Sequence, residues 1–311
     1  MSDVTIRPSS SGGSSLPGGQ PLSLPDELPV GISPFRASLR RFSANKLAIA
    51  SLVILSLITL ACYIAPLFYP FGPEDADFDN LSAPVDFTSI HLFGTDDLGR
   101  DLLLRVLDGG QVSLGLGFFG AIVSVAISVV YGATAGYLGG RADQVMMRMV
   151  DVLLSLPYVM LVIVINVVLG RSNLSLFIAV VVALWLTPAV IARGQAVSLR
   201  HREFIEAARA GGMSNWQIIW QHIAPNSLNV VIVYSSLLVL EVISTESFLS
   251  FVGLGVQAPY ASWGNLINDG YTKIETDIRV LLLPGAFLAT VLFCLNYITD
   301  GLRDAFDPNE R

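Results

Sequence analysis

The sequence predicts an all-α membrane protein with six transmembrane helices and both termini in the cytoplasm. The chain of 311 residues has a mean hydropathy of +0.63, and only 14% of it is charged, whereas soluble domains carry about 25% charged residues. Six apolar runs are long enough to cross a bilayer as helices, which takes about 20 residues each. The distribution of Arg and Lys between the connecting loops gives the orientation.

The expected spans cover residues 47–66, 112–140, 149–170, 172–197, 228–254 and 280–300. In the second span a stripe of small residues recurs every fourth position, which lets another helix approach closely: Gly120, Ser124, Ser128, Gly132 and Gly136. Three prolines fall within expected spans and predict kinks there: Pro157, Pro188 and Pro284.

The six spans divide the charged residues unequally between the two sides. Thirteen of the 18 Arg and Lys residues fall on the side that holds both termini, and an excess of positive charge marks the cytoplasmic side. The external loop 67–111 holds nine Asp and Glu residues but only two Arg, and its net charge of −7 equals the net charge of the whole chain. This loop is either a solvated acidic segment or a docking face for an extracytoplasmic partner, and the acidic charge does not indicate nucleic-acid binding.

Several functions are excluded by residues that the chain lacks. Neither of the two lysines, Lys46 and Lys273, lies in a G-x-x-x-x-G-K-[ST] loop, so no ATP site is expected. Three histidines and two cysteines in apolar runs (Cys62 and Cys294) predict neither a zinc cluster nor a disulfide. Residues 1–35 are rich in Ser, Gly and Pro and are expected to form a disordered cytoplasmic tail.

The cytoplasmic loop 199–226 is too structured in pattern to be a simple turn. Residues 203–210 read as a short helix that Gly211 and Gly212 end. A second helix is expected from Ser214, with Gln217 three residues later as in a capping box. Its apolar face comes from Ile218, Ile219 and Ile223, and Pro225 is expected to close it before the fifth span.

Four motifs in this order resemble bacterial ABC importer permeases. Glu206-Ala207-Ala208 and Gly212, with Ile223 and Pro225 beyond them, are similar to the E-A-A-x-x-x-G loop of these proteins. Residues 93–101 resemble the G-T-D-x-x-G-R-D signature, and residues 300–308 the D-G-L-R-D-x-x-D-P ending, of peptide and nickel permeases. With residues 247–255 and 262–264, the resemblance extends from about residue 41 to residue 311 and is nearest to C subunits of oligopeptide permeases. Ala224, where many members carry Leu, and the carboxylate of Glu241 depart from the pattern.

The resemblance implies a type I ABC importer permease fold in the bacterial inner (plasma) membrane. It also implies a homologous second permease (a B subunit), two cytoplasmic ATPases that bind ATP and Mg²⁺, and an extracytoplasmic binding protein that delivers oligopeptides. The chain itself would be no enzyme and would hold no cofactor. The same machine with a dipeptide, nickel or antimicrobial-peptide cargo is the alternative, and an intramembrane enzyme or a passive channel is a more distant one.

Two sets of residues are predicted to carry function. The first set is predicted to couple the permease to its ATPases, by contacting them and transmitting their conformational change. It consists of Glu203, Glu206, Ala207, Ala208, Arg209, Gly211, Gly212, Ile223 and Pro225. The small side chains of Ala207 and Ala208 keep the short helix 203–210 narrow enough to fit into a groove of a partner protein. The alternative, an amphipathic helix that lies on the membrane surface, would need more bulky apolar residues than this helix contains. The second set, Glu241 and Glu246, is predicted to line the translocation path, because intramembrane carboxylates are costly. A structural hydrogen bond to a neighbouring helix is the alternative for Glu246.

Overall fold

The structure is a computed structural model that describes residues 34–257 and 259–306. Within these residues the fold is all-α, as predicted, with one isolated β-bridge between Thr95 and Asp101. The predicted tail lies outside the described residues, except for positions 34 and 35, which begin the first helix.

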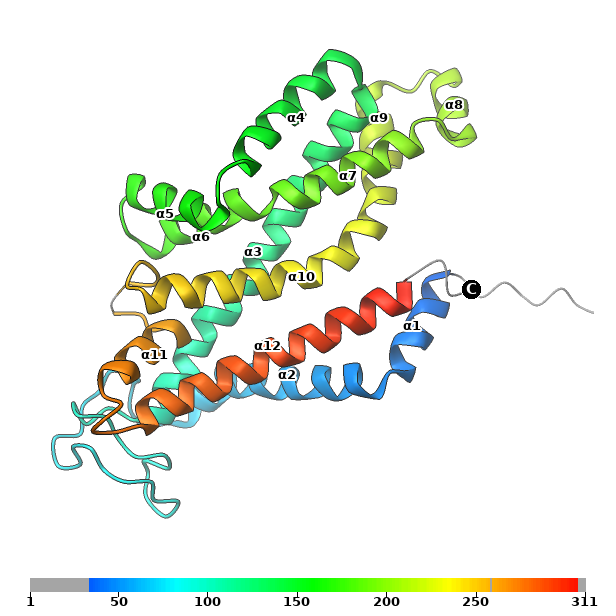
Figure 1. The fold of residues 1–311 in the computed structure, drawn as a ribbon. Coiled ribbons are helices and arrows are strands. Elements are labelled where there is room, and N and C mark those ends of the chain that lie inside the picture. Colours follow the sequence, from blue (N-terminus) through cyan, green and yellow to red (C-terminus); the bar gives the residue numbers. More distant parts are fainter. Residues whose placement is uncertain (1–33, 258, 307–311) are drawn as a thin grey trace, which may run out of the picture.

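The helices form an elongated bundle in which α3 crosses the molecule (Figure 1). The long helices are α2 (Lys46–Ile64), α3 (Leu102–Leu138), α10 (Ala224–Phe251) and α12 (Arg279–Phe306). The shorter ones are α1 (Pro34–Ala44), α4 (Gly140–Leu154), α5 (Tyr158–Val168), α6 (Asn173–Leu184), α7 (Leu186–Leu199), α8 (Glu203–Ala210), α9 (Asn215–Ile218) and α11 (Trp263–Thr272). Helix α3 packs mainly against α7 and α10, and α2 packs along α12.

Four of these helical segments are long and apolar enough to span a membrane: Lys46–Phe68, Leu102–Leu138, Asn173–Leu199 and Arg279–Phe306. The pair α4 and α5 raises the count to five if it forms one bent span. The predicted span 228–254 falls on α10, a continuous helix of 28 residues that is not among those segments. The total of six spans therefore stays a prediction.

One predicted span start is wrong, and another predicted span is broken at Pro157, where a kink was expected. The second span starts ten residues earlier than expected, at Leu102, where the Asp101 side chain accepts the Leu104 N–H at 2.7 Å. The charges of Arg105 and Asp108 concealed this start in the sequence. The predicted helix 149–170 is broken, because α4 and α5 meet at an angle of 92°. Pro157 lies at this break, since it has no N–H to donate and its ring disfavours a helical residue before it.

The stripe of small residues on α3 packs against its neighbours, as predicted. A Cβ added at Gly132 or Gly136 would collide with backbone carbonyls of α7, so the two helix axes approach closely there. Ser128 Oγ donates a hydrogen bond to the Trp185 carbonyl at 2.7 Å. That carbonyl belongs to the junction of α6 and α7, three residues before Pro188.

The two ends of the bundle differ in character (Figure 1). Helix α8, helix α1 and the C-terminal end of α12 lie at one end, and α1 packs against α12. The irregular segment 69–101 lies at the opposite end. The arginine-rich segments and the acidic loop thus lie at opposite ends of the bundle, and the assignment of the first of these ends to the cytoplasm stays a prediction.

Candidate functional site

Helix α8 has the bounds expected from the sequence, Glu203–Ala210. Glu203 and Glu206 lie in its first turn and Arg209 in its last, so these charges favour the helix dipole. Eight residues are too few for a stable isolated helix. The side chain of Ile205 is fully buried and anchors α8 to the core, which contributes about 1.5–3 kcal/mol.

The outer face of α8 is open to a partner. Glu203, Glu206, Ala207 and Arg209 are exposed. Ala208 is partly buried against the hydrophobic core, so the expectation that both alanines point outward holds for Ala207 alone. Figure 1 shows α8 projecting from its end of the bundle beside α9. The helix is thus a small knob with one anchored face and one free face.

The turn after α8 is closed by a Schellman motif. The Met213 N–H donates to the Ala208 carbonyl at 3.2 Å, and the Gly212 N–H donates to the Arg209 carbonyl at 3.1 Å. Gly212 has φ of +84°, the left-handed conformation that glycine adopts without strain. Gly211 has φ of −72° and therefore needs no glycine for its backbone. The predicted requirement for glycine is confirmed at Gly212 alone.

The segment after this turn keeps its predicted cap but not its predicted end. Ser214 and Gln217 form the capping box, with the Ser214 N–H donating to Gln217 Oε1 at 2.8 Å. Pro225 does not close the helix, because α9 continues through a π-helical turn, Ile219–Ile223, into α10. The Ala224 N–H bonds to the Ile219 carbonyl five residues back, and Pro225 has no N–H to restore the α-helical pattern.

Contacts from α8 and α9 reach the C-terminal end of α3. The Arg209 guanidinium carbon lies 5.8 Å from the centre of the Tyr137 ring, a cation–π contact. Tyr137 Oη lies 3.3 Å from Asn215 Oδ1, and Ile218, Ile219 and Ile223 are buried beneath. Arg209 was predicted to belong to the coupling set, but its contact with Tyr137 was not predicted, because nothing in the sequence separates Tyr137 and Asn215 from ordinary residues.

The two carboxylates of α10 have different surroundings, as their spacing predicts. Glu246 is completely buried and accepts hydrogen bonds from Ser113 Oγ at 2.9 Å and Ser250 Oγ at 2.7 Å. Ser113 Oγ in turn accepts the Trp263 N–H at 3.3 Å, so the network joins α3, α10 and α11. This burial favours the structural alternative, and a place for Glu246 on the translocation path stays a prediction. Glu241 is exposed.

Comparison with known proteins assigns this arrangement of helices to a family. A family model described as "Binding-protein-dependent transport system inner membrane component" matches residues 128–311. A second model, "N-terminal TM domain of oligopeptide transport permease C", matches residues 33–84. The chain belongs to the binding-protein-dependent inner-membrane transport components. It is a multi-pass permease of the bacterial inner membrane.

Individual relatives agree with this assignment. The permease is 47% identical to the "Oligopeptide transport system permease protein OppC" of Haemophilus influenzae over 90% of each chain. It is 38% identical to the "Dipeptide transport system permease protein DppC" of Bacillus subtilis, over 88% of this chain and 85% of the relative. A structure of the MetNI methionine ABC transporter in an inward-facing conformation matches with a TM-score of 0.52 and 16% identity, covering 66% of this chain and 97% of that chain. That likeness confirms the predicted type I ABC importer permease fold.

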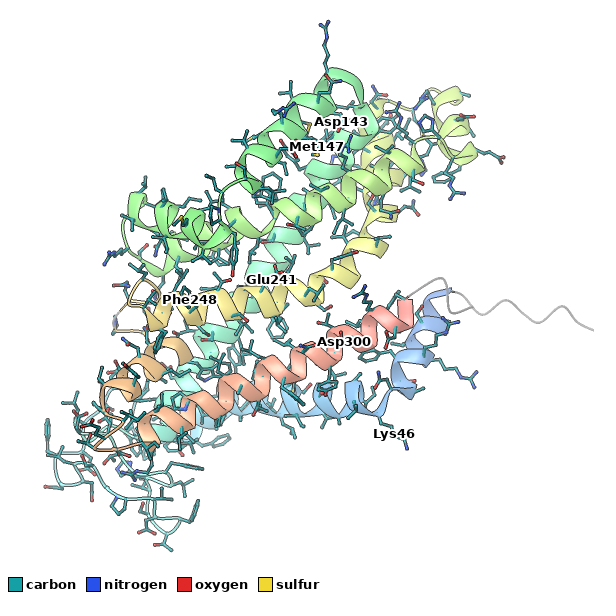
Figure 2. All side chains as sticks on the ribbon, viewed as in Figure 1. Lys46, Asp143, Met147, Glu241, Phe248 and Asp300 are labelled. Atoms are coloured by element: carbon teal, nitrogen blue, oxygen red, sulfur yellow. The ribbon has the colours of Figure 1, made fainter. Side chains whose placement is uncertain are left out.

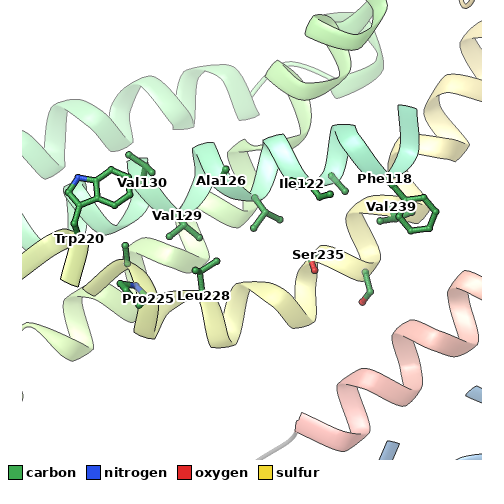
Figure 3. Close-up of a pocket in the computed structure, with 14 residues that line it drawn as sticks. Phe118, Ile122, Ala126, Val129, Val130, Trp220, Pro225, Leu228, Ser235 and Val239 are labelled. Atoms are coloured by element: carbon green, nitrogen blue, oxygen red, sulfur yellow. The ribbon is translucent and has the colours of Figure 1, made fainter. Parts of the chain in front are cut away.

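The permease also has an apolar groove of about 690 Å³ between α3 and α10 (Figure 3). Phe118, Ile122 and Val129 of α3 face Leu228 and Val239 of α10 across it. No charged side chain occurs among its described lining residues. The groove therefore suits an apolar helix better than a charged solute.

The acidic external loop of the permease is folded rather than simply solvated. His91 is buried, with Nδ1 3.0 Å from Asp101 Oδ2 and Nε2 3.3 Å from Asp77 Oδ2. Hydrogen bonds from Asn80, then the Asp79 N–H, then His91 hold the pKa of Asp77 below its usual range. Asp96 accepts from Arg100 and Arg105 at the start of α3. These pairings join residues up to 14 positions apart, and no periodic pattern reveals them.

Proposed function

We propose that this permease is the transmembrane subunit of an ATP-driven importer and carries oligopeptides that an extracytoplasmic binding protein delivers. The oligopeptide proposal is supported by the 47% identity to the OppC protein of Haemophilus influenzae and by the match of residues 33–84 to the N-terminal domain of oligopeptide transport permease C. Within Bacillus subtilis, the oligopeptide and dipeptide permeases are about equally similar to this chain, at 36% and 38% identity, so a dipeptide cargo is the alternative.

The coupling proposal depends chiefly on helix α8. A chain without a P-loop must receive the energy of ATP hydrolysis through a contact with another protein. Helix α8 is suited to that contact, because it projects from the bundle and the buried side chain of Ile205 fixes its base to the core. Two exposed aromatic side chains lie on and beside α8: Phe204, within α8, is 44% exposed, and Trp216, in α9, is 57% exposed. Aromatic residues are enriched among those that dominate binding energy at protein interfaces. We assign α8 to the two cytoplasmic ATPases, which would hold ATP and Mg²⁺.

The remaining partners are assigned to other surfaces of the permease. We assign the apolar groove between α3 and α10 to an apolar helix of the homologous second permease, because no described residue that lines it is charged. We assign the folded acidic loop 69–101 to docking of the binding protein, because this loop covers the end of the bundle opposite α8.

Replacement of Ala207 tests the coupling proposal. In the complete importer, reconstituted in proteoliposomes with the binding protein, Ala207→Trp is expected to abolish ATP-dependent uptake of a tetrapeptide and to reduce co-purification of the ATPases. An enclosing groove would be overpacked, at a cost of about 1–3 kcal/mol. Ala142→Trp, at an exposed position of α4, is the matched control and is expected to transport normally. Normal uptake by Ala207→Trp would exclude α8 as the coupling element.

A further inference from the structure

Glu241 lies at a cavity that the coupling proposal does not use. This cavity of about 340 Å³ is formed where the bend between α4 and α5 faces the junction of α6 and α7, with Glu241 contributed by α10. Its other lining residues are aliphatic apart from Tyr158 and Thr187. Glu241 is the single charged group among the described residues around the cavity.

The carboxylate of Glu241 is unpaired. Within the described part of the chain, no hydrogen-bond donor or cation is recorded at its side-chain oxygens, whereas Glu246 accepts bonds from serine hydroxyls. An intramembrane carboxylate is costly to maintain, and such groups mark substrate or ion pathways by default. An exposed carboxylate in an apolar wall attracts a cation, since few other charges screen it there.

A second, separate cavity lies farther along α4 and α7, toward the end of the bundle that holds α8 (Figure 1). This cavity, of about 640 Å³, is lined by Asp151 of α4 and Val190 of α7. On the same two helices, Leu154 and Leu186 line the Glu241 cavity, so the two cavities lie about one helical turn apart. Figure 2 shows Asp143 and Met147 of the second cavity on α4 and Glu241 on α10. We call the stretch along α4 and α7 that holds both cavities, from Glu241 to the Asp143–Arg193 ion pair, the course.

We propose that Glu241 binds the ammonium group of a peptide in transit along this course between α4, α7 and α10. The inference rests on the proposed peptide-importer function and names a contact for the cargo within it. A carboxylate accepts hydrogen bonds from an ammonium group and balances its charge, and no other described residue lining the Glu241 cavity is charged. The peptide's N-terminus and a lysine side chain both supply such a group.

The test compares cargoes in the complete importer, reconstituted with its binding protein. Uptake by Glu241→Gln is divided by wild-type uptake for Ala-Ala-Ala, for N-acetyl-Ala-Ala-Ala and for N-acetyl-Ala-Lys-Ala. Because each peptide is compared with itself, selection by the binding protein cancels. We expect a loss of about fivefold for the peptides that carry an ammonium group, equivalent to about 1 kcal/mol, and no loss for the neutral one. Loss with Ala-Ala-Ala alone assigns the N-terminus as the contact, and loss with the lysine peptide includes the side chain.

Further variants separate charge from folding. Glu241→Asp is expected to restore the selectivity, and Glu241→Met replaces the amide variant if that one fails to assemble. Glu275→Gln, at an exposed carboxylate in the loop before α12, is the matched control and should change nothing. Equal losses for all three peptides, or no loss, would overturn the inference, as would loss of the second permease on purification, which would assign Glu241 to a subunit contact. If the wild-type importer moves no peptide, the proposed function itself fails.

Discussion

Alanine at Gly212 is expected to weaken the attachment of the ATPases without unfolding the permease. Gly212 has φ of +84°, and no heavy atom lies within 4 Å of the position that a Cβ would occupy. The cost of Gly212→Ala is therefore backbone strain and not a steric clash, about 1–2 kcal/mol for a left-handed residue. The strain falls on the turn that sets the angle between α8 and α9.

Two neighbouring variants make this prediction specific. Gly211→Ala keeps φ at −72°, and its Cβ would make ordinary contacts with the Ala207 and Ala208 carbonyl oxygens at 3.4 Å and 3.5 Å, so it is expected to behave as wild type. Gly212→Asn is expected to lie between the two, because asparagine tolerates the left-handed region.

The measurement is the affinity of the purified permease pair for its ATPases, together with ATP hydrolysis stimulated by peptide-loaded binding protein. If the strain acts fully on the docked conformation, 1–2 kcal/mol corresponds to a loss of about 5- to 30-fold. Equal affinities for Gly212→Ala and Gly211→Ala would refute the reasoning, since the two differ mainly in the backbone conformation that they require.

Glu246→Gln is expected to lower the melting temperature of the assembled permease, because the Ser113 and Ser250 hydroxyls bond to different carboxyl oxygens, at 2.9 Å and 2.7 Å. The amide keeps only one of these two acceptors, so one hydrogen bond worth about 0.5–1.5 kcal/mol is lost. An unchanged melting temperature would contradict the structural role. A hydrogen bond from Lys273 lowers the pKa of Asp97, so folding of loop 69–101 stabilises the ionised carboxylate. Hydrogen-exchange protection of this loop, corrected for intrinsic exchange rates, should therefore persist near neutral pH. It should fall only as the pH drops below the ordinary carboxyl pKa of about 3.9. Asp97→Asn should weaken that pH dependence and leave the part that Asp77 contributes, and an equal dependence in the variant would contradict the prediction. Cysteines at Asp79 and Arg202, both exposed, should be labelled from opposite faces of the membrane by an impermeant thiol reagent, Asp79 from outside, and the reverse pattern would overturn the topology.

The parts of the site that local rules govern were predictable from the sequence. Helix α8, its glycine turn and the Ser214 cap depend on residues within five positions of one another, and the structure contains each of them. Pro157 likewise identified the bend between α4 and α5. The prediction failed at Pro225, because proline at the start of a helix is as acceptable as proline after its end.

Long-range contacts set the remainder, and no local pattern encodes them. The early start of α3 depends on the burial of Arg105 beside Asp96, whereas the sequence shows only a charge that shortens an apolar run. The inward face of Ala208 is set by the core beneath α8. The different burial of Glu241 and Glu246 follows from their angular separation on α10, but which of them faces a cavity depends on the packing of α3, α7 and α11.

Site-directed crosslinking tests the central claim, that α8 docks on the ATPases, most directly. Single cysteines at Ala207 and Ala208 are placed in the complete importer, and crosslinks to the ATPase subunits are measured with a short bifunctional thiol reagent. Ala207 is exposed and Ala208 packs against the core, so the account predicts strong crosslinking from position 207 and much weaker crosslinking from position 208. Crosslinks from neither position, with ATPases still bound and peptide uptake intact, would contradict it.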